Sequence, residues 1–444
     1  MSKPDGHDWA AESRRALILH PHGKAAGPAR RRLPEARLEE AAGLAAAIGL
    51  QVVRAETVTL ARPRPATLLG AGKVDELRAP IAAEEIEVAI IDGQLTPIQQ
   101  RNLERAWNCK VIDRTGLILE IFAERARTKE GRLQVELAQL TYQRSRLVRS
   151  WTHLERQRGA LGAVGGPGET QIEADRRMID DRVVRLRREL DEVTRTRELH
   201  RKTRRDAPYP VVALVGYTNA GKSTLFNRLT GAEVTAQDQL FATLDPTMRA
   251  VGMPGGGRII LSDTVGFVSD LPTHLVAAFR ATLEEVLEAD VIVHVRDIVH
   301  ADSEAQKDDV LDVLADLGVD VAAREAIVEV YNKIDLAGPD DRQRVANQAA
   351  RTPLAVALSA ITGEGCERLL ELIGRRLSLR HQVVELTIDA GDGATLAWLY
   401  RVGEVLERED RRGTARLLVS LDPANLGRVR KRLNLPDDLA AAAE

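Results

Sequence analysis

The segment from Gly216 to Thr224, GYTNAGKST, constrains the fold of this chain more than any other feature. It fits the phosphate-binding pattern G-x-x-x-x-G-K-[ST], follows the apolar run 211–215 and precedes a helical pattern at 225–229. In that context, glycines let backbone N–H groups close around phosphate oxygens, and the helix N-terminus adds partial positive charge. The residues expected to bind phosphate are Gly216, Tyr217, Thr218, Asn219, Ala220, Gly221, Lys222, Ser223 and Thr224.

A second motif, DTVGF, stands at the end of another apolar run at 259–262. Lys222 is placed to reach the β- and γ-phosphates, and the Ser223 hydroxyl to ligate Mg²⁺. An Asp at the strand end can hold the Mg²⁺ shell indirectly, and the glycine three residues later can sense the γ-phosphate through its N–H. The residues expected to form this switch are Asp263, Thr264, Val265, Gly266 and Phe267.

The segment NKID (332–335), which follows the strand pattern 327–331, predicts which base the site binds. Asp335 can accept hydrogen bonds from the N1–H and the amino group of guanine, whereas adenine would leave a buried carboxylate unpaired. Asn332 and Lys333 are expected to tie this loop to the phosphate loop, and the backbone at Ser359 and Ala360 to contact the guanine oxygen. Four motifs in this order predict a guanine-nucleotide site with Mg²⁺ as cofactor.

Position 267, directly after Gly266, is phenylalanine. GTPases that orient the attacking water with a side chain use a glutamine for that role, and phenylalanine cannot replace its hydrogen bonds. The sequence therefore predicts slow intrinsic hydrolysis that a partner accelerates. The alternative is that another side chain or a water network orients the water.

The composition describes a protein of 444 residues with 44% hydrophobic and 29% charged residues, which is ordinary for a globular chain of several domains. Its two cysteines, Cys109 and Cys366, lie far apart without histidines at metal-ligand spacing, so neither a disulfide nor a zinc site is expected. No stretch approaches the ~20 apolar residues of a membrane span, and we expect a cytoplasmic protein.

A basic module interrupts an otherwise acidic chain. Residues 125–206 carry 21 Arg and Lys against 13 Asp and Glu, which leaves the rest at −11 because the formal net charge is −3. Two helical patterns, 124–149 and 169–204, predict an antiparallel hairpin, and the tip 158–169 holds five glycines, more chain than a turn needs. Flanking arginines and a glycine-rich tip favour contact with RNA over a plain linker. The expected contacts are Arg144, Arg146, Arg149, Arg156, Arg158, Gly165 and Gly166.

Strand and helix patterns divide the chain into four regions and predict an α/β fold. Residues 1–123 alternate strands (16–20, 51–54, 87–92, 110–113) with helices and predict a small α/β domain with a largely parallel sheet. Residues 124–206 form the hairpin, 207–379 a P-loop GTPase domain with a parallel-rich sheet, and 380–444 a small α+β domain. In the last region, strands are expected at 383–388 and 414–419 and helices at 395–407 and 426–433.

Several longer strings resemble one family, the HflX ribosome-associated GTPases of the Obg–HflX group. They are GRLQVELAQLTY (131–142), GGPGETQIEADRR (165–177), LGAGKVDEL (69–77), FATLDPTMR (241–249) and DTVGFVSDLP (263–272). The resemblance implies that Phe241, Ala242, Thr243 and Leu244 belong to switch I, with Thr243 as an Mg²⁺ ligand and Thr247 as the alternative. It also makes Asn219 similar to an asparagine that coordinates K⁺ in some relatives, although Asn219 could instead cap the loop.

The resemblance implies GTP hydrolysis coupled to binding of the large ribosomal subunit. The hairpin tip would contact rRNA near the peptidyl-transferase region, and the chain would split or rescue stalled or stress-inactivated ribosomes, partly ribosome-associated and as a monomer. Two alternatives stay open at this point: a large-subunit assembly factor, and an RNA-binding scaffold in which the nucleotide is structural. ATP-driven RNA remodelling by the N-terminal domain is a further alternative, although no helicase motif set is visible.

Overall fold

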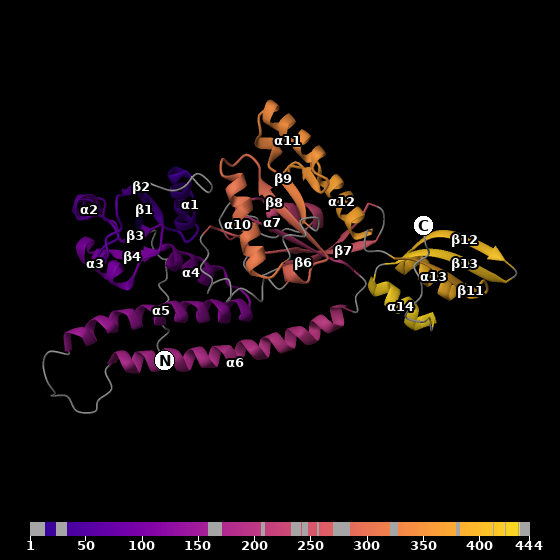
Figure 1. Ribbon diagram of the computed structural model, residues 1–444, viewed down its shortest axis with the longest axis horizontal. Helices are drawn as coiled ribbons and strands as arrows, with labels where there is room; N and C mark the ends of the chain where they lie inside the picture. Colours follow the sequence, from indigo (N-terminus) through magenta and orange to yellow (C-terminus); the bar gives the residue numbers. More distant parts are fainter. Residues whose placement is uncertain are drawn as a thin grey trace.

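The computed structural model describes residues 14–23, 33–158, 171–205, 209–231, 241, 247–254, 257–269, 285–319, 327–378, 382–411, 413–421, 423–433 and 435. These residues form three β-sheets with their helices, which follow one another along the molecule, and two long helices that run below the first sheets in Figure 1. Among them, no helix has both the length and the apolar character that a membrane crossing demands.

The first sheet is four-stranded, in the order β2-β1-β3-β4, and all its strands are parallel, as the sequence predicts. Helices α1 and α4 pack on one face, and α2 and α3 on the other. A parallel sheet covered on both faces needs apolar strands, and all four residues of β3 are buried. The elements are β1 (Arg15–Gly23), α1 (Pro34–Ala46), β2 (Gln51–Leu60), α2 (Ala71–Ala83), β3 (Val88–Ile91), α3 (Pro97–Trp107), β4 (Lys110–Asp113) and α4 (Arg114–Arg125).

Helix ends in this sheet domain follow from local sequence. Thr96 and Gln99 form a reciprocal capping box at the start of α3, and the Asp113 side chain accepts the Gly116 N–H at the start of α4. The glycine-lysine turn at 69–73 is a turn before α2, because Gly70 is its N-cap and Lys73 pairs with Glu56 at 2.8 Å.

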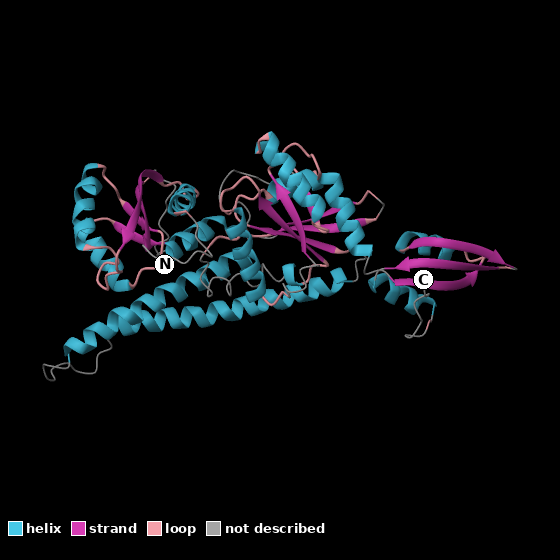
Figure 2. Cartoon of the chain, turned by 45° about the horizontal axis from the view of Figure 1, so that its top comes forward, coloured by secondary structure: helices cyan, strands magenta, loops and turns pink. Residues whose placement is uncertain are grey.

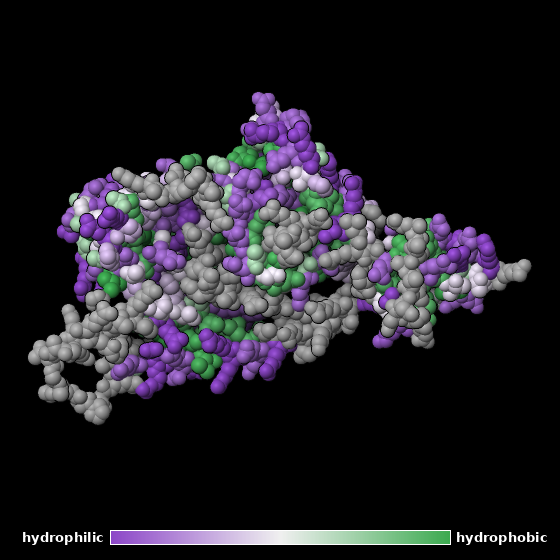
Figure 3. Space-filling view, in the orientation of Figure 1, coloured by the Kyte–Doolittle hydropathy of each residue, from purple (hydrophilic) through white to green (hydrophobic). Residues whose placement is uncertain are grey.

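The two long helices, α5 (Lys129–Arg158) and α6 (Gln171–Arg205), run antiparallel beneath the first sheet domain (Figures 1 and 2). The apolar side chains of α6 are buried in the middle of the helix, where Val183 is 5% and Leu186 0% exposed. Arg182 of α6 makes a two-point hydrogen bond with Glu136 of α5, at 2.7 and 2.9 Å. The visible face of the hairpin carries hydrophilic side chains with an apolar patch between them (Figure 3).

The second sheet has six strands in the order β10-β9-β8-β5-β7-β6, and only β6 is antiparallel to its neighbour. Helices α7 and α12 cover one face, whereas α10 and part of the first sheet domain cover the other. The elements are β5 (Val211–Gly216), α7 (Lys222–Thr230), β6 (Thr247–Gly252), β7 (Arg258–Asp263), β8 (Val291–Asp297), α10 (Ser303–Asp316), β9 (Ile327–Asn332), η2 (Ile334–Leu336), α11 (Pro339–Arg351), β10 (Ala355–Ala357) and α12 (Cys366–Ser378).

The third sheet is antiparallel, in the order β11-β13-β12, and corrects one expectation. The predicted helix 395–407 is wrong beyond residue 402, because the helix ends before Gly403 and the chain continues as a strand. A Cβ at Gly403 would lie 2.5 Å from Leu421 Cδ2 and 3.0 Å from the Ser420 oxygen, so glycine allows the chain to pass close to the neighbouring strand. The elements are β11 (Gln382–Asp389), α13 (Gly393–Val402), β12 (Glu404–Arg411), β13 (Thr414–Leu421) and α14 (Pro423–Leu433).

Candidate functional site

The phosphate-loop segment connects the carboxyl end of β5 to the first turn of α7. Its first glycine, Gly216, has φ +152°, and a Cβ there would lie 2.2 Å from the backbone oxygen of Val295 on the neighbouring strand. Its second glycine, Gly221, has φ +94° and is the N-cap of α7. Both positions need glycine, which explains the spacing of the motif in terms of backbone geometry.

Asn332, at the end of β9, links this loop to the segment around residue 360. Its Nδ2 donates to the Ala220 oxygen at 2.8 Å, and its Oδ1 accepts the Ala360 N–H at 3.0 Å. A Cβ at Gly221 would lie 2.2 Å from the same Nδ2. The asparagine therefore fits against the loop only because residue 221 has no side chain.

Lys222 is almost completely buried at the start of α7, with 6% exposure. Its Nζ donates to the backbone oxygens of Gly216 at 3.0 Å and Tyr217 at 2.8 Å, which turns the ammonium group back over the loop. Burial lowers the pKa of Lys222 to about 8, against the opposing charge of Asp263. An anion bound in the loop would favour the charged form and oppose this lowering of the pKa.

The next residue, Ser223, donates its hydroxyl to Asp263 Oδ2 at 2.7 Å. Asp263 ends β7 and is fully buried, so a hydroxyl and a carboxylate from two elements meet beside the phosphate loop. This all-oxygen donor set suits Mg²⁺, which prefers carboxylates, hydroxyls and phosphate oxygens. Thr243, Ala242 and Leu244 lie outside the described residues, and Thr247 begins β6 opposite Asp263.

Residues 263–267, which we call switch II, are hydrogen-bonded to the phosphate loop through their backbone. Phe267 N donates to the Gly216 oxygen at 3.1 Å, and Thr218 N donates to the Phe267 oxygen at 2.7 Å. Gly266 is equally close, because a Cβ there would lie 2.8 Å from Thr218 Cγ2 and 3.0 Å from Lys222 Nζ. The glycine expected to sense phosphate thus lies directly beside the lysine expected to bind it.

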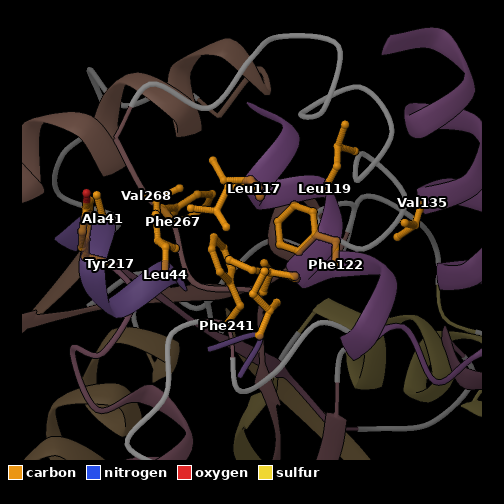
Figure 4. Close-up of a cluster of buried hydrophobic side chains, with 14 of the residues drawn as sticks. Ala41, Leu44, Leu117, Leu119, Phe122, Val135, Tyr217, Phe241, Phe267 and Val268 are labelled. Carbon is orange, nitrogen blue, oxygen red and sulfur yellow. The ribbon is translucent and has the colours of Figure 1, made fainter. Parts of the chain in front are cut away.

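The side chains of Phe241 and Phe267 point away from the loop into an apolar cluster at the junction with the first sheet domain (Figure 4). Phe267 is 2% exposed, and Phe241 meets Phe122 of α4 edge to face, with ring centroids 4.7 Å apart. Leu44 and Leu117 of the first domain belong to the same cluster. The Phe267 ring is therefore part of the apolar core of this junction.

A polar network completes this junction. The Tyr217 hydroxyl donates to Glu40 Oε1 and accepts the Ser269 N–H, each at 2.8 Å. Arg114 of α4 donates to Glu40 Oε1 at 2.7 Å, to Asp92 Oδ1 at 2.6 Å and to the Ser269 hydroxyl at 2.9 Å. One arginine thereby joins the first sheet domain to the end of switch II.

The Asp92 carboxyl, which follows β3, is only 3% exposed. Burial alone would raise its pKa, but a hydrogen bond with His20 Nδ1 at 2.7 Å and the charges of Arg114 and Arg37 outweigh burial and lower the pKa to about 2. Asp92 is therefore ionised at neutral pH, and the positive charges of Arg114 and Arg37 stabilise its buried carboxylate.

The segment expected to recognise the base lies at the ends of β9 and β10. Lys333 has φ +68° and pairs with Asp297 at 2.8 Å, while the Asp335 carboxylate receives no hydrogen bond from the residues that the structure describes. Ser359 is fully buried, and its hydroxyl accepts the Thr362 N–H at 3.1 Å. The Asp335 oxygens are thus available to a ligand.

The hairpin arginines differ in their surroundings. Arg144 pairs with Asp180 of α6 at 2.7 Å and is 42% exposed, whereas Arg146 is 17% exposed and bonds Asp113 and Gln100 of the first sheet domain. Arg149, Arg156 and Arg158 lie in α5, where their side chains are not described, and Gly165 and Gly166 lie outside the described residues. Arg146 therefore anchors the hairpin to the domain above it.

Comparison with known proteins covers nearly the whole chain. Residues 35–123 match the GTP-binding GTPase N-terminal family, 125–204 the GTP-binding GTPase middle region, 211–333 the 50S ribosome-binding GTPase family and 344–439 the HflX C-terminal domain. A GTPase HflX from Magnetococcus marinus is 52% identical over 395 residues, covering 88% of this chain and 89% of its own length.

The chain belongs to the HflX family of GTPases. The Escherichia coli GTPase HflX is also similar, with 44% identity over 84% of this chain and 86% of its own length. Among solved structures, a complex of SsGBP with GDP has a TM-score of 0.46 at 23% identity and covers 82% of this chain and 98% of its own. The nucleotide motifs described above thus lie in a GTP-binding GTPase of the HflX family, and the chain is an enzyme.

The sequence did not reveal the polar junction of this HflX-family GTPase. Glu40 contacts Tyr217, which is 177 residues away in the sequence, and Arg114 contacts Ser269, which is 155 residues away. No sequence motif links residues that far apart. A signal was present only in Tyr217, a large side chain in a loop where small residues would suffice to surround phosphate.

Proposed function

We propose that this HflX-family GTPase binds the large ribosomal subunit in its GTP form and splits or rescues stalled or stress-inactivated ribosomes. The proposal is supported most by one arrangement. The phosphate loop and switch II pack against the first sheet domain, and that domain also carries the basic hairpin. A matched family described as a 50S ribosome-binding GTPase agrees with this partner.

In this proposal GTP binds at the carboxyl edge of the six-stranded sheet. The loop 216–224 surrounds the phosphates, Lys222 neutralises charge on the β- and γ-phosphates, and the Gly266 N–H senses the γ-phosphate. Asp335 receives the guanine donors, while Asn332 and Lys333 support the base, and the backbone at Ser359 and Ala360 contacts the guanine oxygen. Switch I comprises residues 241–244.

Mg²⁺ would be held by Ser223 and Thr243 directly and by Asp263 indirectly, and when bound it supplies charge neutralisation between the β- and γ-phosphates. K⁺ is proposed as a second cation, with Asn219 as a ligand. Asn219, within the loop, has a φ of +60°, a backbone conformation that asparagine tolerates better than most residues. Comparing the GTPase rate in K⁺ with that in Na⁺ tests this assignment, and equal rates would remove it.

Hydrolysis in this site depends on positioning and charge. The water oxygen bonds to the γ-phosphorus while the bond to the β–γ bridging oxygen breaks. Because Phe267 is committed to the apolar cluster, the free enzyme should be slow and its partner should accelerate it. GTP would order residues 241–244 and 263–267, and their packing against α4 would transmit that state to the hairpin.

Contact with rRNA is proposed at the distal part of the hairpin, near the peptidyl-transferase region of the subunit. Arg144, Arg149, Arg156 and Arg158 would approach RNA phosphates, with Gly165 and Gly166 at the tip. Arg146 is not included, because it is bonded to the first sheet domain.

The domains proposed are 1–123, 124–206, 207–379 and 380–444. We further propose that the protein acts as a cytoplasmic monomer, with part of it on ribosomes at any time.

The test measures GTP turnover with and without large ribosomal subunits, for the full chain and for a chain lacking residues 158–168. Strong stimulation of the full chain, lost with the tip, supports the proposal. Undiminished stimulation and normal subunit binding without the tip would refute the hairpin's role. Subunit binding with no stimulation at all would favour a scaffold in which the nucleotide is structural.

A further inference from the structure

The hydroxyl of Thr218 is a buried polar group without an assigned role. Thr218 is 6% exposed, and its Oγ1 is buried with no hydrogen-bond partner among the residues that the structure describes. Other buried hydroxyls around the loop are bonded: Thr264 donates to the Leu214 oxygen at 2.6 Å, and Ser262 to Glu285 at 3.0 Å. An unbonded hydroxyl destabilises a fold, so its presence here calls for a ligand.

The position of Thr218 specifies that ligand. Its Cγ2 would lie 2.8 Å from a Cβ at Gly266, and the same Cβ would lie 3.0 Å from Lys222 Nζ. The threonine side chain and the lysine ammonium thus both lie directly beside Gly266, and this lysine and this glycine are the residues proposed to contact the γ-phosphate. Thr218 follows β5, whereas Asp335, at the base end of the proposed pocket, follows β9.

The proposed site lacks the glutamine that would hydrogen-bond the attacking water, and the Thr218 hydroxyl can make such a hydrogen bond. Phe267 occupies the position after the switch glycine, but its ring is buried and its N–H and oxygen are bonded to Gly216 and Thr218. The backbone N–H of Thr218 is therefore already used, whereas its hydroxyl has no partner among the residues that the structure describes. A hydroxyl both donates and accepts, so it can contact a phosphate oxygen and the incoming water.

We infer that Thr218 is a catalytic residue whose hydroxyl hydrogen-bonds the γ-phosphoryl group and helps to orient the attacking water, in place of the missing glutamine. This inference rests on the proposed guanine-nucleotide site. No covalent bond to threonine forms: the water oxygen bonds to phosphorus, the bond to the bridging oxygen breaks, and GDP and phosphate leave. The water protons pass to the phosphate and to solvent.

The experiment uses the full chain and three variants. Thr218→Val removes the hydroxyl at nearly constant shape, and Thr218→Ser keeps it. Thr230→Val is the matched control, since Thr230 ends α7, the helix that follows the loop, and its hydroxyl donates to the Phe226 oxygen at 2.7 Å. Single-turnover GTP hydrolysis, GDP affinity and the melting temperature are measured for each.

We expect Thr218→Val to slow hydrolysis by about tenfold to a hundredfold, the effect of losing one hydrogen bond to a charged reacting group. GDP affinity and melting temperature should not change, because GDP lacks the γ-phosphoryl group. Thr218→Ser should retain the rate within about threefold, and Thr230→Val should behave as the unaltered protein.

Hydrolysis by Thr218→Val at the unaltered rate would overturn the inference and leave the nucleotide site standing. A loss of GDP affinity or of melting temperature together with rate would also overturn it, because the hydroxyl would then serve the fold. If the unaltered protein failed to bind GDP, the proposed site and the inference would fall together, and this result is distinct from the other two.

Discussion

Replacing Arg114 with methionine tests how strongly the first sheet domain is fixed to the nucleotide domain. Arg114 is 2% exposed and hydrogen-bonds the Asp92 and Glu40 carboxylates at 2.6 and 2.7 Å and the Ser269 hydroxyl at 2.9 Å. Methionine has a similar length without charge. The variant therefore leaves two carboxylates near a junction that excludes water.

The size of the destabilisation depends on which partners Asp92 and Glu40 keep after the substitution. Removing one partner of a buried ion pair costs about 3–5 kcal/mol, because the other charge stays buried and uncompensated. Asp92 keeps His20 and, 3.8 Å away, Arg37, and Glu40 keeps the Tyr217 hydroxyl. Because these contacts remain, we expect the opening free energy to fall by about 3 kcal/mol, the lower end of that range.

The assay is hydrogen exchange of the backbone amides of β1 and β3 in the full chain, which reports local opening without assuming one cooperative transition. Arg78→Met is the matched control, because Arg78 and its partner Asp75 are 60% and 68% exposed and their pair should contribute at most about 1 kcal/mol. If the two variants lowered the opening free energy equally, the reasoning about burial would be refuted.

Three further predictions concern the nucleotide pocket. The Lys222 ammonium has a pKa of about 8 in the free protein, and bound phosphate keeps it charged. GDP affinity should therefore fall as the pH rises, by about fourfold from pH 7 to 8.5. Fluorescence titrations measure this affinity, and the Lys222→Arg variant, whose guanidinium does not titrate in this range, should show no such dependence on pH. Gly221→Ala should abolish GDP binding with little change in circular dichroism, because its Cβ would lie 2.2 Å from Asn332 Nδ2 at φ +94°; retained binding would show that the loop can relax. The Asp335→Asn variant should bind GTP at least about a hundredfold more weakly and bind xanthosine triphosphate more tightly, because a carbonyl of xanthine accepts the new amide donor. Competition binding measures both affinities. An unchanged preference for GTP would show that the base binds elsewhere.

The nucleotide domain could be predicted from the sequence because its signals are local. Each motif directly follows a short apolar run, and parallel strands bring their carboxyl ends to one edge of the sheet. The glycines at 216 and 221 were expected to allow close approach, and their positive φ angles and the neighbouring Val295 and Asn332 supply the reason. The fold class, including the parallel first sheet, is confirmed.

Strand β12 could not be predicted, because it carries charge on both faces. Its residues 404–411 include Glu404, Glu407, Arg408 and Glu409, so no apolar alternation marks a strand at the edge of the sheet. A register shift between Val405 and Glu407 disrupts the pattern further. The helical pattern of α13 therefore extended too far in the prediction.

Arg146 shows why long-range partners escape sequence reasoning. It resembles its basic neighbours in the hairpin, but helical geometry turns it toward the first sheet domain, where it meets Asp113 and Gln100 and lies over the Tyr142 ring at 4.2 Å. Only the packing of α5 against α3 and α4 distinguishes it from Arg144. The same limit applies to Arg114, whose partners come from three separate segments.

The central claim is that the guanine nucleotide controls attachment to the large ribosomal subunit. Co-sedimentation of the full chain with purified large subunits, in parallel with GDP and with a non-hydrolysable GTP analogue, measures this directly. The account predicts tight association with the analogue and weak association with GDP. Association of comparable strength in both states would contradict it.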